Sequence, residues 1–203
     1  MKLFFSPGSS SLAPHIALRE AGLAFDLERV DLKSKKYGKD RDFLRINPKG
    51  YVPTLQFEDG SVLTEVPAIV LWAADQVPER HLAPPPGTME RYHLIEWLSF
   101  VSAELHKQFS PLFNPASGDD LKQRLRELVA RRFDFVQSAL GANPYLMGET
   151  FTVADASLFT VLSWCRWVDI DLARWPKLAD YLARVAARPR VQAALAAERP
   201  PKN

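Results

Sequence analysis

The sequence has very little cysteine, since Cys165 is the only one among its 203 residues. A single thiol excludes an intrachain disulfide, a Cys-x-x-Cys redox pair and a zinc site built from several cysteines. The four histidines have no carboxylates at metal-ligand spacing, so we expect no metal. Any redox chemistry of thiols must therefore use a thiol that the protein does not supply. Cys165 itself lies in an apolar stretch and is interpreted as a small core residue.

Long apolar runs and an excess of one charge are also missing. No apolar run of signal-peptide length follows Lys2, and no uncharged apolar stretch reaches the roughly 18 residues of a membrane span. The net charge is only +2, which argues against binding to nucleic acid or to a membrane surface. With 47% hydrophobic and 25% charged residues, the chain has an ordinary globular composition. We therefore expect a soluble cytoplasmic protein.

The first half of the chain alternates short apolar runs with helical stretches. The patterns predict a strand at Lys2–Phe5, a helix from about residue 11 to Gly22, a strand at 25–31, a short helix at 40–46, a hairpin of strands 51–57 and 61–63, and a helix at 67–76. The first two strands should be parallel, because a right-handed helical crossover joins them. The order is therefore β-α-β-α-β-β-α, an α/β domain over residues 1–77.

The second half has helical spacing throughout. Four prolines and a glycine interrupt all regular structure between residues 77 and 87, so we expect a linker at 78–88 and an all-α domain, a helical bundle, at 89–203. Apolar residues recur every three or four positions from Leu94 to Phe109 and again over 121–140. Thr152 and Asp155 fit a capping box that starts a central apolar helix at 153–168. Helices at 175–187 and 189–197 complete the prediction.

Five segments, in order along the whole chain, give the sequence a resemblance to a known family. They are SPGSSSLAPHIAL at 6–18, NPKGYVPTL at 47–55, LTEVPAI at 63–69, the stretch 96–107, and FTVAD at 151–155. Together they resemble the cytosolic glutathione transferases, and the opening segment resembles the bacterial beta class. The resemblance implies a thioredoxin-like N-terminal domain that binds glutathione as co-substrate, and a helical domain with a pocket for a hydrophobic substrate.

The same resemblance implies an activity and an assembly. The expected reaction is conjugation of the glutathione thiolate to a small hydrophobic electrophile, as in detoxification, by a homodimer without a metal. Two alternatives stay open. One is a protein that binds glutathione or hydrophobic ligands without turnover, and the other is a glutathione-dependent isomerase or dehalogenase on the same fold, since fold alone does not decide the second substrate.

Three serines precede the first predicted helix. A thiol with a pKa of about 8.5 is mostly protonated near neutral pH, so an enzyme that uses it must stabilise the thiolate. Helix N-terminal N–H groups and a serine hydroxyl can do so. The resemblance points to Ser10, where beta-class members usually carry cysteine, with Ser9 and Ser11 as competitors. The ordinary interpretation of such serines is a helix cap.

Other site residues follow from the resemblance. His106 matches an active-site histidine. The resemblance implies a cis bond between Val52 and Pro53, leaving the Val52 backbone open to pair with the cysteinyl part of glutathione. The remaining candidates for glutathione binding are Lys35, Glu65, Val66, Ser99, Ala103 and Glu104.

Glu65 and Val66 precede a helix and would hold the γ-glutamyl amino group and carboxylate, while Lys35 would hold the glycyl carboxylate. Ser99, Ala103 and Glu104 match positions that meet glutathione, some of them across a dimer interface. The candidate pocket for the hydrophobic substrate comprises Phe109, Leu112, Phe113 and Trp164, all of which could equally belong to the core. We expect Asp155 to be a structural residue, because capping already accounts for it.

Overall fold

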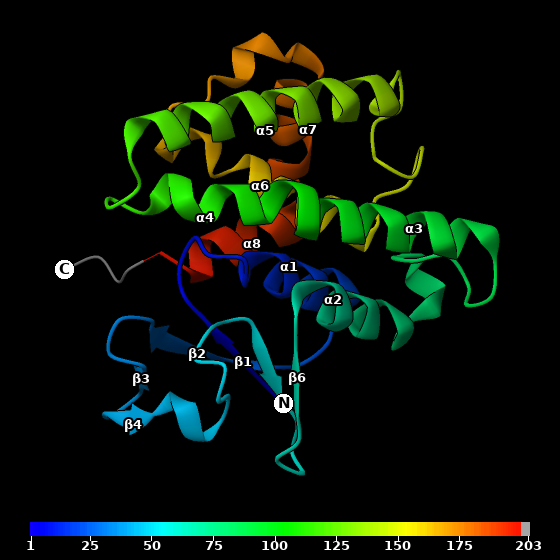
Figure 1. Cartoon of the computed structure of the whole chain (residues 1–203). Helices are drawn as coiled ribbons and strands as arrows, with labels where there is room; N and C mark the ends of the chain where they lie inside the picture. The colour runs from blue at the N-terminus through cyan, green and yellow to red at the C-terminus, as the bar shows by residue number, and fades with distance from the viewer. Residues whose placement is uncertain (200–203) are drawn as a thin grey trace. The chain divides into compact units, whose positions relative to one another are not determined.

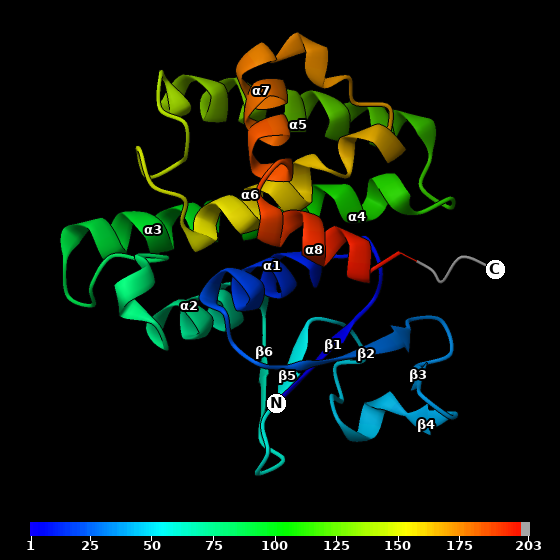
Figure 2. The same cartoon turned by 180° about the vertical axis from the view of Figure 1, so that it is seen from behind.

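The computed structural model describes residues 1–199, and contacts within the chain divide it into two compact units. The first unit is Met1–Ala83 together with the described residues from Arg188 onward, and the second is Pro84–Ala187. Figures 1 and 2 show the first unit in blue, cyan and red and the second in green to orange. No helix among the described residues is long and apolar enough to cross a membrane.

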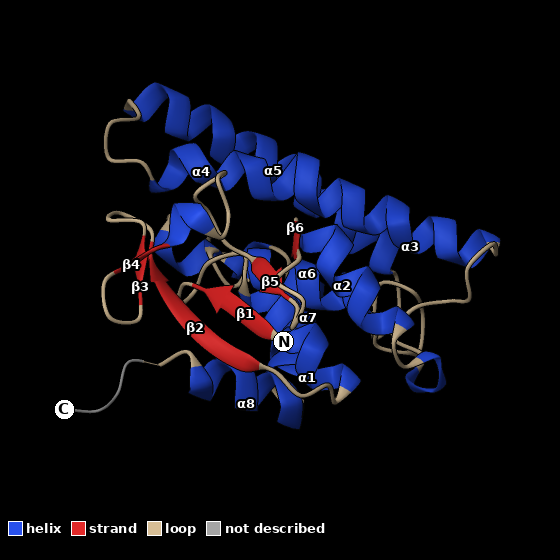
Figure 3. Cartoon of the chain, turned by 90° about the horizontal axis from the view of Figure 1, so that it is seen from below, coloured by secondary structure: helices blue, strands red, loops and turns tan. Residues whose placement is uncertain are grey.

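A mixed sheet forms one layer of the first unit (Figure 3). Its order is β4-β3-β2-β1-β5-β6. The bounds are Lys2–Phe5 for β1, Asp26–Asp31 for β2, Lys36–Tyr37 for β3, Arg41–Asp42 for β4, Thr54–Gln56 for β5 and Val62–Thr64 for β6. As predicted, β1 is parallel to β2, and β5 and β6 form an antiparallel hairpin. β1 is buried from Leu3 to Phe5, as expected for an apolar inner strand.

Among the described residues, the first unit has three α-helices: α1 (Leu12–Ala21), α2 (Val66–Asp75) and α8 (Pro189–Ala197). α1 packs against both of the others, and Figures 1 and 2 show all three on the same side of the sheet. α1 ends where predicted, because Gly22 adopts the left-handed conformation with φ 70° that closes many helices.

The helix predicted at 40–46 is wrong as an α-helix. The chain there forms the short strand β4 and then a single 3-10 turn, Phe43–Arg45. Asp40 has a left-handed φ of 67°, the Asp42 carboxylate accepts the Leu44 N–H at 2.9 Å, and Pro48 disfavours helix at the residue before it. The segment is therefore too short between these breaks to nucleate an α-helix.

The last helix also differs from the prediction, which assigned it to the helical domain. α8 groups with the first unit. Its apolar face is buried at Val191 and Ala194, and just before the helix the Arg188 guanidinium pairs with the buried Glu20 carboxylate at 2.7 Å. An amphipathic pattern indicates which face of a helix is buried but not which neighbour covers it. The sequence therefore could not show to which of the two units α8 belongs.

The second unit is all-helical. Its elements are α3 (Met89–Phe100), a π-helical segment (Val101–His106), α4 (Lys107–Phe113), α5 (Asp119–Leu140), α6 (Val153–Leu162) and α7 (Pro176–Ala186). The predicted apolar stripe from Leu94 to Phe109 is buried at every position. All ten residues of α6 are buried, which confirms it as the central helix of this unit.

The central helix is shorter than the 153–168 predicted. It ends at Leu162, and a 3-10 turn, Cys165–Trp167, follows. The Ser163 hydroxyl donates to the Thr160 carbonyl at 2.7 Å, and the Trp164 N–H bonds to the Val161 carbonyl in a tightened last turn. The capping box at its start is present, with the Thr152 N–H donating to the Asp155 carboxylate at 2.8 Å.

Candidate active site

The loop from β1 to α1 is closed by two serine hydroxyls. Ser11 is fully buried, and its Oγ donates to the Ser6 carbonyl at 3.3 Å while accepting the Ser6 N–H at 3.2 Å. The Ser9 Oγ lies 2.8 Å from the Ser11 Oγ and accepts the Ser11 N–H at 3.3 Å. A hydroxyl has one proton, and Ser11 gives its own to Ser6, so Ser9 donates to Ser11. Both hydroxyls therefore hold the turn together.

Ser10 faces a different part of the first unit. Its half-buried hydroxyl donates to the Val52 carbonyl at 3.4 Å, a long hydrogen bond. The peptide bond between Val52 and Pro53 is cis, as the resemblance implied. Of the three serines, Ser10 is thus the one whose hydroxyl lies against the backbone expected to meet the ligand.

The segment 47–53 is shaped by a buried asparagine. The Asn47 side-chain amide donates to the Tyr51 carbonyl and to the Thr54 hydroxyl, each at 2.9 Å, and its oxygen accepts the Lys49 N–H at 3.1 Å. These bonds satisfy Asn47 inside the fold and fix the loop. The Lys35 ammonium reaches the same segment and donates to the Gly50 carbonyl at 2.6 Å.

Glu65 stands at the start of α2 in an unusual backbone conformation. Its φ of 73° is rare for a residue with a side chain, and such residues often lie at functional sites. Its carboxylate pairs with the Lys49 ammonium, with Oε1 2.7 Å from Nζ. The hydrogen bond to Glu65 is the main cause that raises the pKa of Lys49 above its usual value. The next residue, Val66, opens the helix, and its N–H precedes Pro67, which has none.

A residue just after α8, Glu198, also holds the loop between β1 and α1 in place. The Glu198 carboxylate accepts the Gly8 N–H at 3.1 Å and lies 2.9 Å from Nδ1 of the fully buried His15. Arg19 donates to the other ring nitrogen of His15 at 2.8 Å, so Nδ1 of the neutral ring is the one that carries the proton and donates to Glu198. Sequence reasoning missed this cluster, because Glu198 is 190 residues from Gly8.

The remaining candidate residues belong to the second unit. His106 is half-buried in the π-helical segment, a geometry often found at functional sites, and its ring lies 5.0 Å from that of Trp164. Ser99 and Ala103 are exposed. Glu104 is held by the Arg132 guanidinium, whose two nitrogens approach one carboxylate oxygen at 3.0 and 2.8 Å.

Three of the four pocket candidates are core residues of the second unit. Phe109, Leu112 and Trp164 are all less than a tenth exposed, whereas Phe113 is 44% exposed. Phe113 lies beside the exposed ring of Trp167, 6.4 Å away, and its ring is 6.0 Å from that of the buried Trp164.

The second unit buries the ionisable groups of Cys165 and Asp155. Burial raises the pKa of the Cys165 thiol to about 12, which makes it unreactive. Burial also raises the pKa of Asp155, against hydrogen bonds from Leu146, Thr152 and Tyr181 that lower it. Both match their predicted structural roles.

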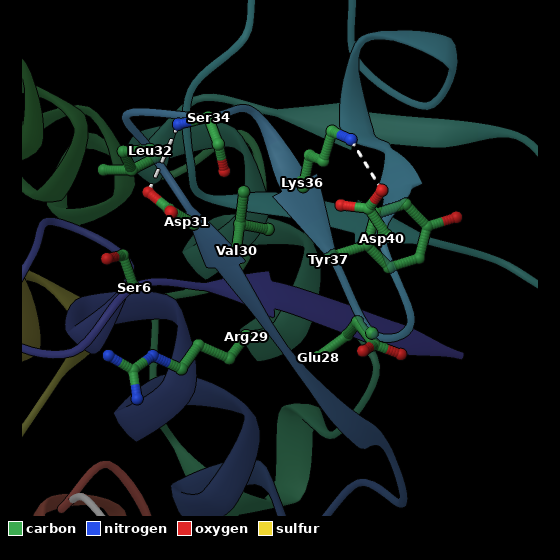
Figure 4. A pocket seen from close by; sticks show the side chains of 11 residues that line it. Ser6, Glu28, Arg29, Val30, Asp31, Leu32, Ser34, Lys36, Tyr37 and Asp40 are labelled. Carbon is green, nitrogen blue, oxygen red and sulfur yellow. Dashed lines mark hydrogen bonds and ion pairs between the residues drawn. The ribbon is translucent and has the colours of Figure 1, made fainter.

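The first unit also contains an open polar hollow of about 630 Å³ (Figure 4). Residues of β2, of β3 and of the turns on either side of β3 line it, with Ser6 at one side. Its charged groups include the exposed ion pair of Lys36 and Asp40. None of the predicted site residues lines this hollow. Within residues 1–199, no group of three or more His, Cys, Asp or Glu side chains could hold a metal.

Comparison with known proteins assigns the chain to a family. Residues 9–76 match the glutathione S-transferase N-terminal domain and residues 100–189 match the C-terminal domain. Glutathione S-transferase GstA of Escherichia coli O157:H7 is 44% identical over 198 residues, with 98% of each chain covered.

Two solved structures extend this similarity to the fold. A ternary complex of BphK, a bacterial GST, has a TM-score of 0.96 at 56% identity and covers 98% of this chain and 99% of its own. A sphingomonad glutathione S-transferase complexed with glutathione has a TM-score of 0.94 at 46% identity, covering 98% of each chain. The chain belongs to the glutathione S-transferase family, and the predicted pairing of a thioredoxin-like domain with a helical domain is confirmed.

Proposed function

We propose that this protein is a glutathione transferase of the beta type in which Ser10 stands where the class usually has cysteine. It joins the glutathione thiolate to a hydrophobic electrophile. The observation that carries this proposal is the Ser10 hydroxyl, 3.4 Å from the Val52 carbonyl and beside the cis Val52–Pro53 bond. That backbone is where the family resemblance implies the cysteinyl part of glutathione.

Ser10 stabilises the thiolate by donating a hydrogen bond from its hydroxyl group to the sulfur. The long bond to Val52 is weak, so the hydroxyl can turn to a better acceptor when glutathione pairs with the Val52 backbone. The N-terminal N–H groups of α1 add positive potential at the same place. A serine cannot form a mixed disulfide with glutathione, which favours conjugation over thiol-disulfide exchange.

The other candidate residues of the first unit bind the charged groups of glutathione. Lys35 binds the glycyl carboxylate, while Glu65 and the Val66 N–H bind the γ-glutamyl amino group and carboxylate. Lys35 and Glu65 are both tied to the segment 47–53, which supports a shared binding surface. Ser9 and Ser11 shape the loop that carries Ser10.

The second unit supplies the electrophile side. His106 takes part in the reaction, as the family resemblance implies, and Phe113 contacts the hydrophobic substrate together with Phe109 and Trp164, whose rings lie against it. In the homodimer that we propose, Ser99, Ala103 and Glu104 lie toward glutathione of one subunit or the other. The thiolate sulfur then forms a bond to the electrophilic carbon. The bond from that carbon to the leaving group breaks, and its electron pair departs with the leaving group.

Conjugation kinetics test the proposal. With glutathione and a chloronitroaryl electrophile at neutral pH, the rate should exceed the uncatalysed rate, saturate in glutathione, and fall in the Ser10→Ala variant. A rate equal to the uncatalysed one, with saturable binding of glutathione, would instead support a binding protein. A full rate in Ser10→Ala would remove Ser10 from the mechanism.

A further inference from the structure

One charged side chain at the candidate site has no role in the function proposed above. The Lys49 ammonium lies 2.7 Å from Glu65 Oε1 and 2.9 Å from the Thr64 hydroxyl, at the start of α2. Lys49 comes from the segment 47–53, so this ion pair joins that segment to α2. Glu65 is the residue expected to bind the γ-glutamyl amino group.

The γ-glutamyl end of glutathione is a zwitterion, with an ammonium and a carboxylate on the same carbon atom. A carboxylate beside an ammonium, as in Glu65 and Lys49, presents the opposite order of charges at hydrogen-bonding distance. A zwitterion placed against this pair makes two attractive contacts, whereas Glu65 alone attracts the ammonium and repels the carboxylate.

We propose that Lys49 is a specificity residue that binds the α-carboxylate of the γ-glutamyl group while Glu65 binds its ammonium. This inference rests on the proposed glutathione site. It assigns recognition of the amino-acid end to a matched pair of side chains, in addition to the Val66 N–H.

The hydrogen-bonding capacity of the pair permits this arrangement. An ammonium has three N–H donors, and within residues 1–199 Lys49 uses two, on Glu65 and Thr64. Glu65 contacts Lys49 through Oε1, which leaves Oε2 for the ligand ammonium. The two side chains are 46% and 56% exposed, and a pair this open contributes little to stability, so it can adjust when the ligand enters.

The chain offers a matched control in Lys36. Its ammonium pairs with Asp40 at the same distance, 2.7 Å, and its side chain is 45% exposed. Lys36 and Lys49 therefore each form a partly exposed ion pair with a carboxylate at the same distance, in different parts of the first unit. A general effect of removing one surface cation would appear in both variants.

The experiment compares Lys49→Met, Lys49→Arg and Lys36→Met with the wild type, using calorimetric titration at neutral pH. The ligands are glutathione, 4-aminobutyryl-cysteinyl-glycine, which lacks the α-carboxylate, and glutaryl-cysteinyl-glycine, which lacks the amine. Lys49→Met should weaken glutathione and the glutaryl peptide roughly three- to tenfold, as for a partly exposed charged contact, and leave the aminobutyryl peptide nearly unchanged. KM for glutathione should rise with kcat unaltered, and Lys49→Arg and Lys36→Met should resemble the wild type.

Other results overturn the inference. An equal loss for all three peptides would mean that Lys49 only holds Glu65 or the loop in place. Tighter glutathione binding by Lys49→Met would mean that Lys49 competes with the ligand for Glu65, and unchanged binding would mean that it takes no part. Failure of the wild type to bind glutathione at all would reject the proposed function itself, which separates the two failures.

Discussion

The Ser10 hydroxyl and the Val52 carbonyl oxygen lie 3.4 Å apart, although 42 positions separate the two residues in the chain. This contact joins the entrance of α1 to the segment that ends in the cis Val52–Pro53 bond. The same contact distinguishes Ser10 from Ser9 and Ser11, whose hydroxyl groups form hydrogen bonds within their own loop. One serine of the three is thereby free of a turn-closing role and lies at the candidate ligand backbone.

Replacing Ser10 with alanine should impair the chemistry but not the fold. Loss of a hydrogen bond to a charged sulfur costs about 1.5–3 kcal/mol, so kcat/KM at neutral pH should fall at least tenfold and its pH profile should shift to higher pH. Stability in urea should change by less than about 0.5 kcal/mol, because the bond to Val52 is long. An unshifted profile with an undiminished rate would contradict the assignment.

Replacing Ser11 with alanine should give the opposite result. Its buried hydroxyl satisfies both backbone groups of Ser6, so its loss should lower the free energy of unfolding by about 1–3 kcal/mol. Urea denaturation followed by circular dichroism measures the effect, and the Ser10→Ala variant is the matched control. Equal stability of the two variants would show that Ser11 does not close the turn.

Glu198→Ala tests the fastening of the serine loop to the end of α8. The change removes the carboxylate that accepts hydrogen bonds from the buried His15 ring and from the Gly8 N–H, so the free energy of unfolding should fall by about 1–3 kcal/mol. The exposed Glu79 serves as control, and Glu79→Ala should stay within about 0.5 kcal/mol of the wild type. A Glu198→Ala protein as stable as the control would show that the cluster contributes nothing.

Cys165 makes the free energy of unfolding depend on pH in the alkaline range. Burial raises the pKa of its thiol from 9.0 to about 12 in the folded protein. Above pH 9 the unfolded chain releases this proton before the folded chain does, so stability contributed by the protonated thiol is lost as pH rises, by about 1.4 kcal/mol per pH unit up to 12.

A Cys165→Ala variant isolates this effect from the titration of lysine and tyrosine. The difference in unfolding free energy between wild type and variant should be constant below pH 9 and shrink above it. The native thiol should also resist an aromatic disulfide reagent at pH 8 and react only after unfolding. Rapid reaction of the native protein would show that the thiol is not buried.

Local chemistry made much of the fold predictable. The Gly22 end of α1, the capping box of Thr152 and Asp155, and the buried stripe from Leu94 to Phe109 each depend on neighbours within a few turns of chain. Elements decided by distant partners were not predictable. The placement of α8 depends on contacts with α1, and the ends of β3 and β4 depend on pairing between two-residue strands.

The candidate site divides in the same way. The resemblance pointed to Val52 and Glu65 as candidates and to Ser10 ahead of Ser9 and Ser11, and the hydrogen bonds distinguish Ser10 from its two neighbours. Lys49 was missed because a lysine beside glycine in a loop is ordinary surface chemistry until Glu65, 16 positions later, is seen beside it. The one available signal was its place in the NPKGYVP segment that the resemblance already marked.

Ultraviolet difference absorbance during titration with glutathione at neutral pH tests the central claim most directly. We expect a saturable thiolate band with the wild type and, at equal occupancy, a much weaker band with Ser10→Ala. Saturable binding of glutathione by calorimetry, without a thiolate band in the wild type, would contradict the claim that Ser10 and the start of α1 activate the thiol.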